Sequence, residues 1–117
     1  MAYDIGLLDW VRDAMAPLGS VSHRPMMGGA TLYCDGTVFA ILAYDALWFK
    51  ADAQSDAAWD AMDCSRFTVE MAGRTASMNY RRAPDDVYDD ADELRRLGAL
   101  GLAAGTRNPP RSKARRR

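Results

Sequence analysis

Two turn signals in the first half of the chain constrain its fold more than any other feature. Gly28-Gly29 and Asp35-Gly36 separate short apolar runs, and each dipeptide is typical of the two-residue turn of a β-hairpin, which needs positive φ angles. Tyr44-Asp45-Ala46 separates the next two runs and predicts a turn of about three residues. Strands joined by such tight turns are antiparallel neighbours, so we expect a meander of three or four strands over residues 21–50.

Helical patterns lie before, between and after the strands. Capping residues and apolar spacings of three and four predict helices over residues 4–19 and 52–62, and a last helix from the capping box at Asp90 to Gly105. Alternating apolar residues predict two more strands within residues 67–80, and Pro84 suits the first turn of a short helix. The order predicts an α+β fold with two layers, an antiparallel sheet with helices on one face.

The turns also assign side chains to the two faces of the sheet. Two-residue turns pair residues whose numbers sum to 57 in the first hairpin and to 71 in the second. For the third hairpin we expect a three-residue turn, because a two-residue turn would place Lys50 in the core. We expect one core that buries Leu7, Val11, Val69 and Met78 together with the helix-facing residues Pro25, Met27, Ala30, Leu32, Phe39, Ile41, Leu47 and Phe49. The opposite face is expected to carry Arg24, Met26, Thr31, Tyr33, Val38, Ala40, Leu42, Trp48 and Lys50.

Composition sets the class of protein. One core can serve 117 residues, of which 49% are hydrophobic, so we expect one domain over residues 1–105. No apolar run reaches the roughly 20 residues that span a bilayer, and charges interrupt residues 1–19, where a signal peptide would be apolar. Cys34 and Cys64 stand apart, as free thiols of a reducing compartment do. We therefore expect a cytoplasmic protein without membrane contact.

The charge is distributed unevenly along the chain. Residues 107–117 contain six cations and no anion, whereas residues 1–106 contain nine cations against sixteen anions, a net charge of −7. Residues 106–117 also lack large apolar side chains and contain two adjacent prolines, so we expect a disordered basic tail. Such a tail is typical of a solubilising end or of a segment that covers the domain's own acidic surface, and it also allows weak, non-specific binding of nucleic acid. Its candidate contacts are Arg107, Arg111, Lys113, Arg115, Arg116 and Arg117.

Residues suited to catalysis or metal binding are sparse. His23, the only histidine, lies opposite Cys34 in the expected register, but zinc needs at least three protein ligands and a cysteine nucleophile needs an oxyanion site. The acidic runs at 85–86 and 89–93 lie at helix starts, where carboxylates complement the helix dipole. Gly28-Gly29 precedes a strand and not a helix, so it is not a phosphate-binding loop. We predict no enzyme, no cofactor and no metal site.

Two blocks of motifs run through most of residues 5–105. The first block is Arg24-Pro25-Met26-Met27-Gly28-Gly29, Leu32-Tyr33-Cys34-Asp35-Gly36, Phe39-Ala40 and Leu47-Trp48-Phe49-Lys50. The second is Met78-Asn79-Tyr80-Arg81-Arg82-Ala83-Pro84-Asp85-Asp86-Val87, followed by Asp90-Ala91-Asp92-Glu93-Leu94. Together they resemble the N-terminal domain of the TfoX/Sxy family, with Met27 where the family usually has Phe and Ala30-Thr31 where it often has Gly.

The resemblance implies an α-β-β-β-α-β-β-α arrangement similar to secretion-chaperone folds, and a non-enzymatic role in regulating competence genes for DNA uptake. We therefore expect a protein-binding module that contacts a partner protein, or a second copy in a homodimer, through the open face of the sheet. The predicted protein-binding face consists of Arg24, Met26, Tyr33, Val38, Leu42, Trp48 and Lys50. The alternative is a nucleic-acid-associated protein that binds through the basic tail.

Overall fold

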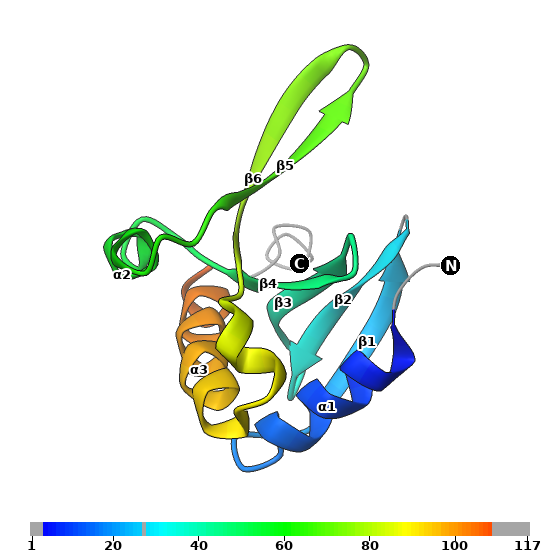
Figure 1. Ribbon diagram of the computed structural model, residues 1–117, viewed down its shortest axis with the longest axis vertical. Coiled ribbons are helices and arrows are strands. Elements are labelled where there is room, and N and C mark those ends of the chain that lie inside the picture. The colour runs from blue at the N-terminus through cyan, green and yellow to red at the C-terminus, as the bar shows by residue number, and fades with distance from the viewer. Residues whose placement is uncertain (1–3, 27, 109–117) are drawn as a thin grey trace, which may run out of the picture.

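The computed structural model describes residues 4–26 and 28–108, apart from the side chains of residues 69, 71 and 76. Its elements are α1 (Ile5–Met15), β1 (Val21–Met26), β2 (Gly29–Cys34), β3 (Thr37–Ala43), β4 (Ala46–Lys50), α2 (Asp56–Ala61), β5 (Arg66–Met71), β6 (Arg74–Arg82), the 3-10 helix η1 (Asp85–Tyr88) and α3 (Ala91–Arg107). The strands form one antiparallel sheet in the order β1-β2-β3-β4-β6-β5, and α1 and α3 pack together on one face of it (Figure 1). The predicted α+β fold is confirmed.

Three hairpins turn on two residues that both have left-handed backbone angles, as type I′ turns require. The turn residues are Asp35-Gly36, Tyr44-Asp45 and Ala72-Gly73, with φ between 49° and 85°. The expected three-residue turn at 44–46 is therefore wrong, since the turn is one residue shorter.

The first hairpin also turns one residue earlier than expected. Met26 pairs with Gly29, so the paired numbers sum to 55 instead of 57. A shift of two residues leaves each side chain on its expected face, because side chains alternate with a period of two.

A β-bulge in β3 changes the faces more than the turns do. The pairing of β2 with β3 shifts between Leu32 and Tyr33, which makes Phe39 the extra residue of β3. Beyond the bulge the expected assignment reverses. Leu42 lies in the main core under the helices, and Ile41 lies in a second cluster on the opposite face.

Strand β4 nevertheless has the expected faces. Leu47 and Phe49 lie in the main core, whereas Trp48 lies in the second cluster on the other face. The bulge and the shorter turn each shift the pairing by one residue, and the two shifts cancel. The faces predicted for β4 from the exclusion of Lys50 are therefore correct, although the turn length used to predict them is wrong.

The main core fills the space between the helices and the sheet. Phe49 and Trp59 are fully buried there and stack, with ring centroids 5.6 Å apart.

Leu7 is half-buried and packs against this core. Pro25 and Met78 are exposed, contrary to expectation, because Pro25 lies on an edge strand and Met78 lies on the face away from the helices. The predicted burial of Met27 and Val69 concerns parts of the chain outside the described structure, which leaves out residue 27 and the side chain of residue 69. The other large apolar side chains of this core with almost no exposure are Val11, Met15, Leu32, Phe39, Leu42, Leu47, Leu94 and Leu97.

Helix α3 lies directly on β3 because it carries glycines at the contact. A Cβ atom at Gly101 would lie 2.5 Å from the Phe39 carbonyl oxygen, and one at Gly105 would collide with the Val38 carbonyl oxygen. Gly105 was expected to end the helix, but the helix continues to Arg107. Such close approach of backbones requires residues without side chains.

Candidate functional site

The open face is the side of the sheet opposite α1 and α3. The cluster of buried apolar residues on this face contains strand residues only, whereas the cluster on the other face includes residues of both helices. The strand pairing places six of the seven predicted protein-binding residues on the open face. They are Arg24, Met26, Tyr33, Val38, Trp48 and Lys50. The seventh, Leu42, is wrong: the bulge turns it into the main core, where it is 1% exposed.

Trp48 supports the open face from within and is itself only 7% exposed. Its indole Nε1 donates a hydrogen bond to the Ala43 carbonyl oxygen at 3.0 Å, and its ring meets the Phe67 ring edge-on at a centroid distance of 4.9 Å. The Arg82 guanidinium lies over the same indole, 5.6 Å from the ring centroid. On the far side, Phe67 stacks on Tyr44 at 5.7 Å. Trp48 is therefore fixed and largely covered by strand residues.

Lys50, Tyr80 and Tyr33 are half-buried polar residues at the margin of the open face. Lys50 pairs with Tyr80 across β4 and β6, and the ammonium nitrogen lies 5.2 Å from the Tyr80 ring centroid. Burial lowers the pKa of Lys50, against an opposing effect of Asp52. Burial also raises the pKa of Tyr80, and Tyr33 adds to that increase. The three polar tips therefore lie in a partly desolvated environment, where each keeps an apolar stem on the sheet.

Strands β6 and β5 also contribute to this face, which was not predicted from the sequence. Phe67, Tyr80 and Arg82 belong to it because β6 is hydrogen-bonded to β4, directly beside Lys50. The alternation of Met78 with Tyr80 indicated a strand. Nothing in the alternation indicates which edge of the first four strands receives the second hairpin, because the connection runs through α2.

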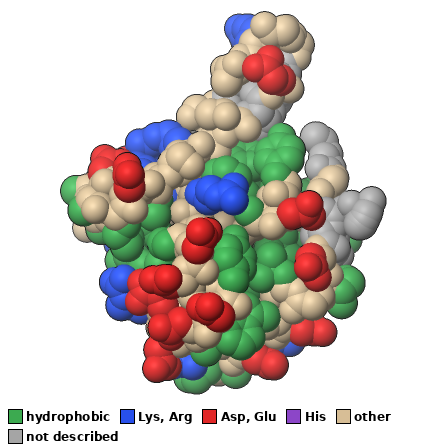
Figure 2. All heavy atoms as spheres, in the orientation of Figure 1, with side chains coloured by type: hydrophobic (Ala, Val, Ile, Leu, Met, Phe, Trp, Pro, Cys, Tyr) green, Lys and Arg blue, Asp and Glu red, His purple; other side chains and the backbone are tan. Residues whose placement is uncertain are grey.

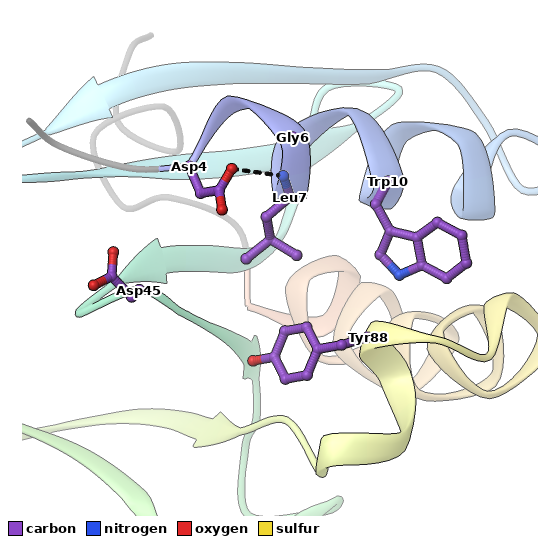
Figure 3. Close-up of a pocket in the computed structure, with 6 residues that line it drawn as sticks. All are labelled: Asp4, Gly6, Leu7, Trp10, Asp45 and Tyr88. Carbon is purple, nitrogen blue, oxygen red and sulfur yellow. Dashed lines mark hydrogen bonds between the residues drawn. The ribbon is translucent and has the colours of Figure 1, made fainter.

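A shallow pocket opens between α1, the β3–β4 turn and η1 (Figure 3). The Tyr88 hydroxyl accepts a hydrogen bond from the Leu47 backbone N–H at 2.9 Å, and the Trp10 indole donates one to the Val87 carbonyl oxygen at 2.8 Å. These bonds join η1 to β4 and to α1, so the pocket lies at a packing junction. In Figure 2, acidic side chains are grouped around hydrophobic ones over the lower half of the molecule. The pocket is lined by Asp4, Gly6, Leu7, Trp10, Asp45 and Tyr88.

The one histidine and the first cysteine do not meet. His23 pairs with Leu32 and Cys34 with Val21, because the first hairpin has the shifted register. Cys34 is 1% exposed, and burial followed by the charge of Asp35 raises its pKa, so its thiol is a poor nucleophile. Among residues 4–26 and 28–108, no three His, Cys, Asp or Glu side chains are grouped to hold a metal ion. Within the same residues no helix combines the length and apolar character that a membrane crossing needs.

Arg107 is engaged within the fold. Its Nε and Nη2 donate to the Asp52 carboxylate at 2.6 and 2.8 Å, and the Asn108 amide donates to the same carboxylate at 3.0 Å. These bonds, that of Arg107 first, hold the pKa of Asp52 well below its usual range. Arg107 thus attaches the end of α3 to the segment after β4. The other predicted tail contacts, Arg111, Lys113, Arg115, Arg116 and Arg117, lie outside the described residues.

Comparison with known proteins identifies the family. The chain belongs to the TfoX N-terminal domain family, whose model matches residues 13–105. It is also similar to Protein Sxy of Escherichia coli (strain K12), with 29% identity over 98 residues. The matched region covers 80% of this chain and 44% of that relative, so the chain spans less than half of the relative's length. The family indicated by the two motif blocks is confirmed, and the domain is related to competence regulators.

Proposed function

We propose that this domain is a non-enzymatic protein-binding module of a competence-type regulator, and that it contacts a partner protein through the open face. The observation that carries the proposal is a margin of half-buried polar and apolar side chains around a packed apolar cluster that none of the described helices covers. The margin consists of Met26, Tyr33, Val38, Lys50 and Tyr80. The cluster beneath it consists of Ile41, Ala43, Ala46, Trp48 and Phe67.

The composition of this margin suits a protein contact. Tyrosine and methionine are enriched at protein interfaces. Tyrosine provides a large contact area with few rotatable bonds, and methionine has a flexible side chain that adapts its shape to the partner. The cluster below is already packed, so binding does not have to order it. Thr31 also donates a hydrogen bond to the Met26 sulfur at 3.2 Å, which fixes one end of the margin.

A photo-crosslinking amino acid at position 33 tests the contact directly. Tyr33→benzoylphenylalanine in the native cell should capture a defined protein on irradiation, because the half-buried side chain belongs to the margin that forms the proposed interface. Ile5→benzoylphenylalanine is the matched control, since Ile5 is 59% exposed but lies on α1, on the helix side. Equal capture at both positions, or capture of nucleic acid at position 33, would contradict the proposal.

A second test links the contact to regulation. Tyr33→Asp and Lys50→Glu change the margin without touching the main core, so the circular dichroism spectrum should stay that of the wild type. Transcripts of competence genes should fall in cells that carry these variants in place of the wild type. Normal transcript levels with both variants would show that the open face has no part in regulation.

The basic tail supports the alternative function, because residues 109–117 contain five cations and no anion. Five engaged cations would give a salt slope of about −4.5 for duplex DNA. A truncation after Asn108 leaves α3 and the Asp52 contact intact and removes those cations. Unchanged affinity for duplex DNA at low salt would exclude this role, and an equal loss for unrelated sequences would support it.

A further inference from the structure

The two edges of the sheet differ in how they are protected. β1 is the edge on one side, and it carries Pro25, whose missing N–H blocks the pairing of a further strand. β5 is the edge on the other side and has no proline. Among the described residues, no strand other than β6 bonds to the backbone of β5. From Phe67 to Met71, beyond a register shift between Arg66 and Phe67, its outer N–H and C=O groups therefore offer a template for another strand.

The hairpin of β5 and β6 also extends beyond the body of the domain. Residues 80–82 of β6 pair with β4, whereas residues 74–78 pair with β5 alone. We name residues 67–78 the arm, which projects away from the helices and the other strands (Figures 1 and 2). An isolated two-stranded hairpin is marginally stable in water, and more strands are needed to stabilise it.

We propose that β5 pairs with β5 of a second copy, antiparallel and across a two-fold axis, so that two six-stranded sheets become one. A second copy fits because the edge is complementary to itself: two identical antiparallel strands present the same donors and acceptors to each other. This inference uses the backbone edge of β5 and does not depend on the partner contact proposed for the open face.

The charges of β5 select the register. Alternate residues of a strand direct their backbone groups outward, so outward groups meet in a symmetric pair only where the paired residue numbers have an even sum. A sum of 132 sets Arg66 opposite Arg66 of the second copy, and a sum of 140 sets Glu70 opposite Glu70. Sums of 134 and 138 set each charged residue of the strand opposite an uncharged one. A sum of 136 sets Arg66 opposite Glu70 at both ends and Thr68 opposite itself. Opposite charges stabilise directly paired positions and like charges destabilise them, so we expect the sum of 136.

The side chains of this register are accessible. Arg66, Thr68 and Glu70 are all exposed. Arg66 donates to Asn79 at 2.7 Å and lies 3.6 Å from Asp56, which leaves further N–H groups of its five for a carboxylate of the second copy.

The oligomeric state of the full chain gives the first test. Sedimentation equilibrium over a concentration series should show a mass that rises from 12.9 kDa towards twice that value. A mass that stays at the monomer value up to millimolar concentration would overturn the proposal.

Charge reversal tests the register without relying on any single variant. Glu70→Arg sets arginine opposite arginine at both ends, and Arg66→Glu sets glutamate opposite glutamate, so each variant alone should be monomeric. A mixture of the two restores opposite charges at both ends and should dimerise. If both variants dimerise as the wild type does, or if the mixture stays monomeric, the register is wrong.

Cysteine trapping provides a test that keeps the charges. Thr68→Cys should form a disulfide between two copies under mild oxidation, because the two residues at position 68 face each other on the axis. Ser77→Cys is the matched control: Ser77 pairs with Thr68 and is also exposed, but it lies on the inner strand, about 14 Å from its counterpart by strand spacing. Equal trapping at both positions, or dimers that Tyr33→Asp dissociates and Glu70→Arg does not, would overturn the proposal.

Discussion

The covered face and the open face of the sheet are made by alternate residues of the same strands, yet their side chains are buried by different means. In β4, Phe49 is fully buried under α3 and against Trp59 of α2. Its neighbour Trp48 points the other way and is buried by strand residues alone, mainly Phe67 and Arg82. Helices bury most of one face, whereas the second hairpin buries only the middle of the other.

This difference separates stability from binding. On the covered face a lost side chain leaves a cavity between elements that cannot close, and on the margin of the open face a lost side chain leaves a space that water fills. The margin of the open face can therefore vary in sequence at small cost to the fold. The comparison predicts that substitutions of similar size differ sharply between the two faces.

The largest difference is expected between Phe49→Ala and Tyr33→Ala. Phe49→Ala should lower the free energy of unfolding by about 3 to 5 kcal/mol, because it removes a fully buried ring from the main core. Tyr33→Ala should lower it by less than about 1 kcal/mol, since Tyr33 is half-buried at the margin. Urea unfolding at pH 7 measures both values. Similar losses would mean that the open face is part of the core.

Two adjacent arginines of β6 give the next difference. Arg81 is 2% exposed on the helix side and donates to Asp60 at 2.8 Å, to the Cys64 carbonyl oxygen at 2.9 Å and to Asp56 at 3.0 Å. Arg81→Ala should cost about 3 kcal/mol, near the lower limit for a broken buried pair, because both aspartates keep contact with water.

The neighbouring Arg82 is the control for this position. It is exposed and lies over Trp48, so Arg82→Ala should cost about 0.5 to 1 kcal/mol, the value of an exposed cation–π contact. Unfolding curves of both variants under the same conditions decide the matter. Equal losses would show that the Asp56 and Asp60 contacts add nothing to stability.

The third difference concerns the close contact of α3 with β3. Gly101→Ala places a Cβ 2.5 Å from a backbone oxygen that cannot move freely, and we expect a loss of about 1 to 3 kcal/mol despite the better helix propensity of alanine. Gly6→Ala is the matched substitution in α1, where the new Cβ meets only the end of the Asp4 side chain at 3.2 Å. It should be neutral or stabilise slightly. A stabilising Gly101→Ala would show that α3 does not need this close approach.

The turns and caps of the fold were predictable from sequence because their chemistry is local. Asp35-Gly36 specifies a type I′ turn with its own backbone preferences, and the Asp90 carboxylate accepts the Glu93 N–H at 3.1 Å as its capping box predicts. The bulge was not predictable in this way. Residues 38–43 are all apolar, so either face can accept them, and only pairing with β2 decides which residue is extra.

The site was less predictable than the fold, because it depends on where distant segments meet. Trp48 was expected to form part of an open surface, and no pattern in the chain indicated that Phe67 would cover it. Arg81 and Arg82 look alike in the chain, and only the position of α2, with its two aspartates, distinguishes the buried one from the exposed one. Alternation assigns faces within a strand, but it does not show which strands lie together.

The smallest effect is expected for Asp52→Asn, which weakens the attachment of α3 beyond the end of β4. The bonds from Arg107 and Asn108 hold the pKa of Asp52 below its usual range, so the carboxylate stabilises the fold fully above the pKa of the unfolded chain, about 3.9. That contribution is lost as the pH falls towards the lower pKa of the folded state. Because the pair is accessible to water, it contributes less than the buried contacts above.

The difference in free energy of unfolding between the wild type and Asp52→Asn should therefore be constant from pH 7 to about pH 5 and shrink below about pH 4. Glu93, whose pKa is lowered mainly by Arg96, is present in both proteins and cancels from the difference. Asp92→Asn is the control, since its side chain is 92% exposed and pairs with Arg95 on the surface of α3. Chemical denaturation at half-unit pH intervals measures all three proteins. If the wild type and Asp52→Asn lose stability in parallel below pH 4, Arg107 does not hold the end of α3 in solution, and the helix ends before the residues that contact Asp52.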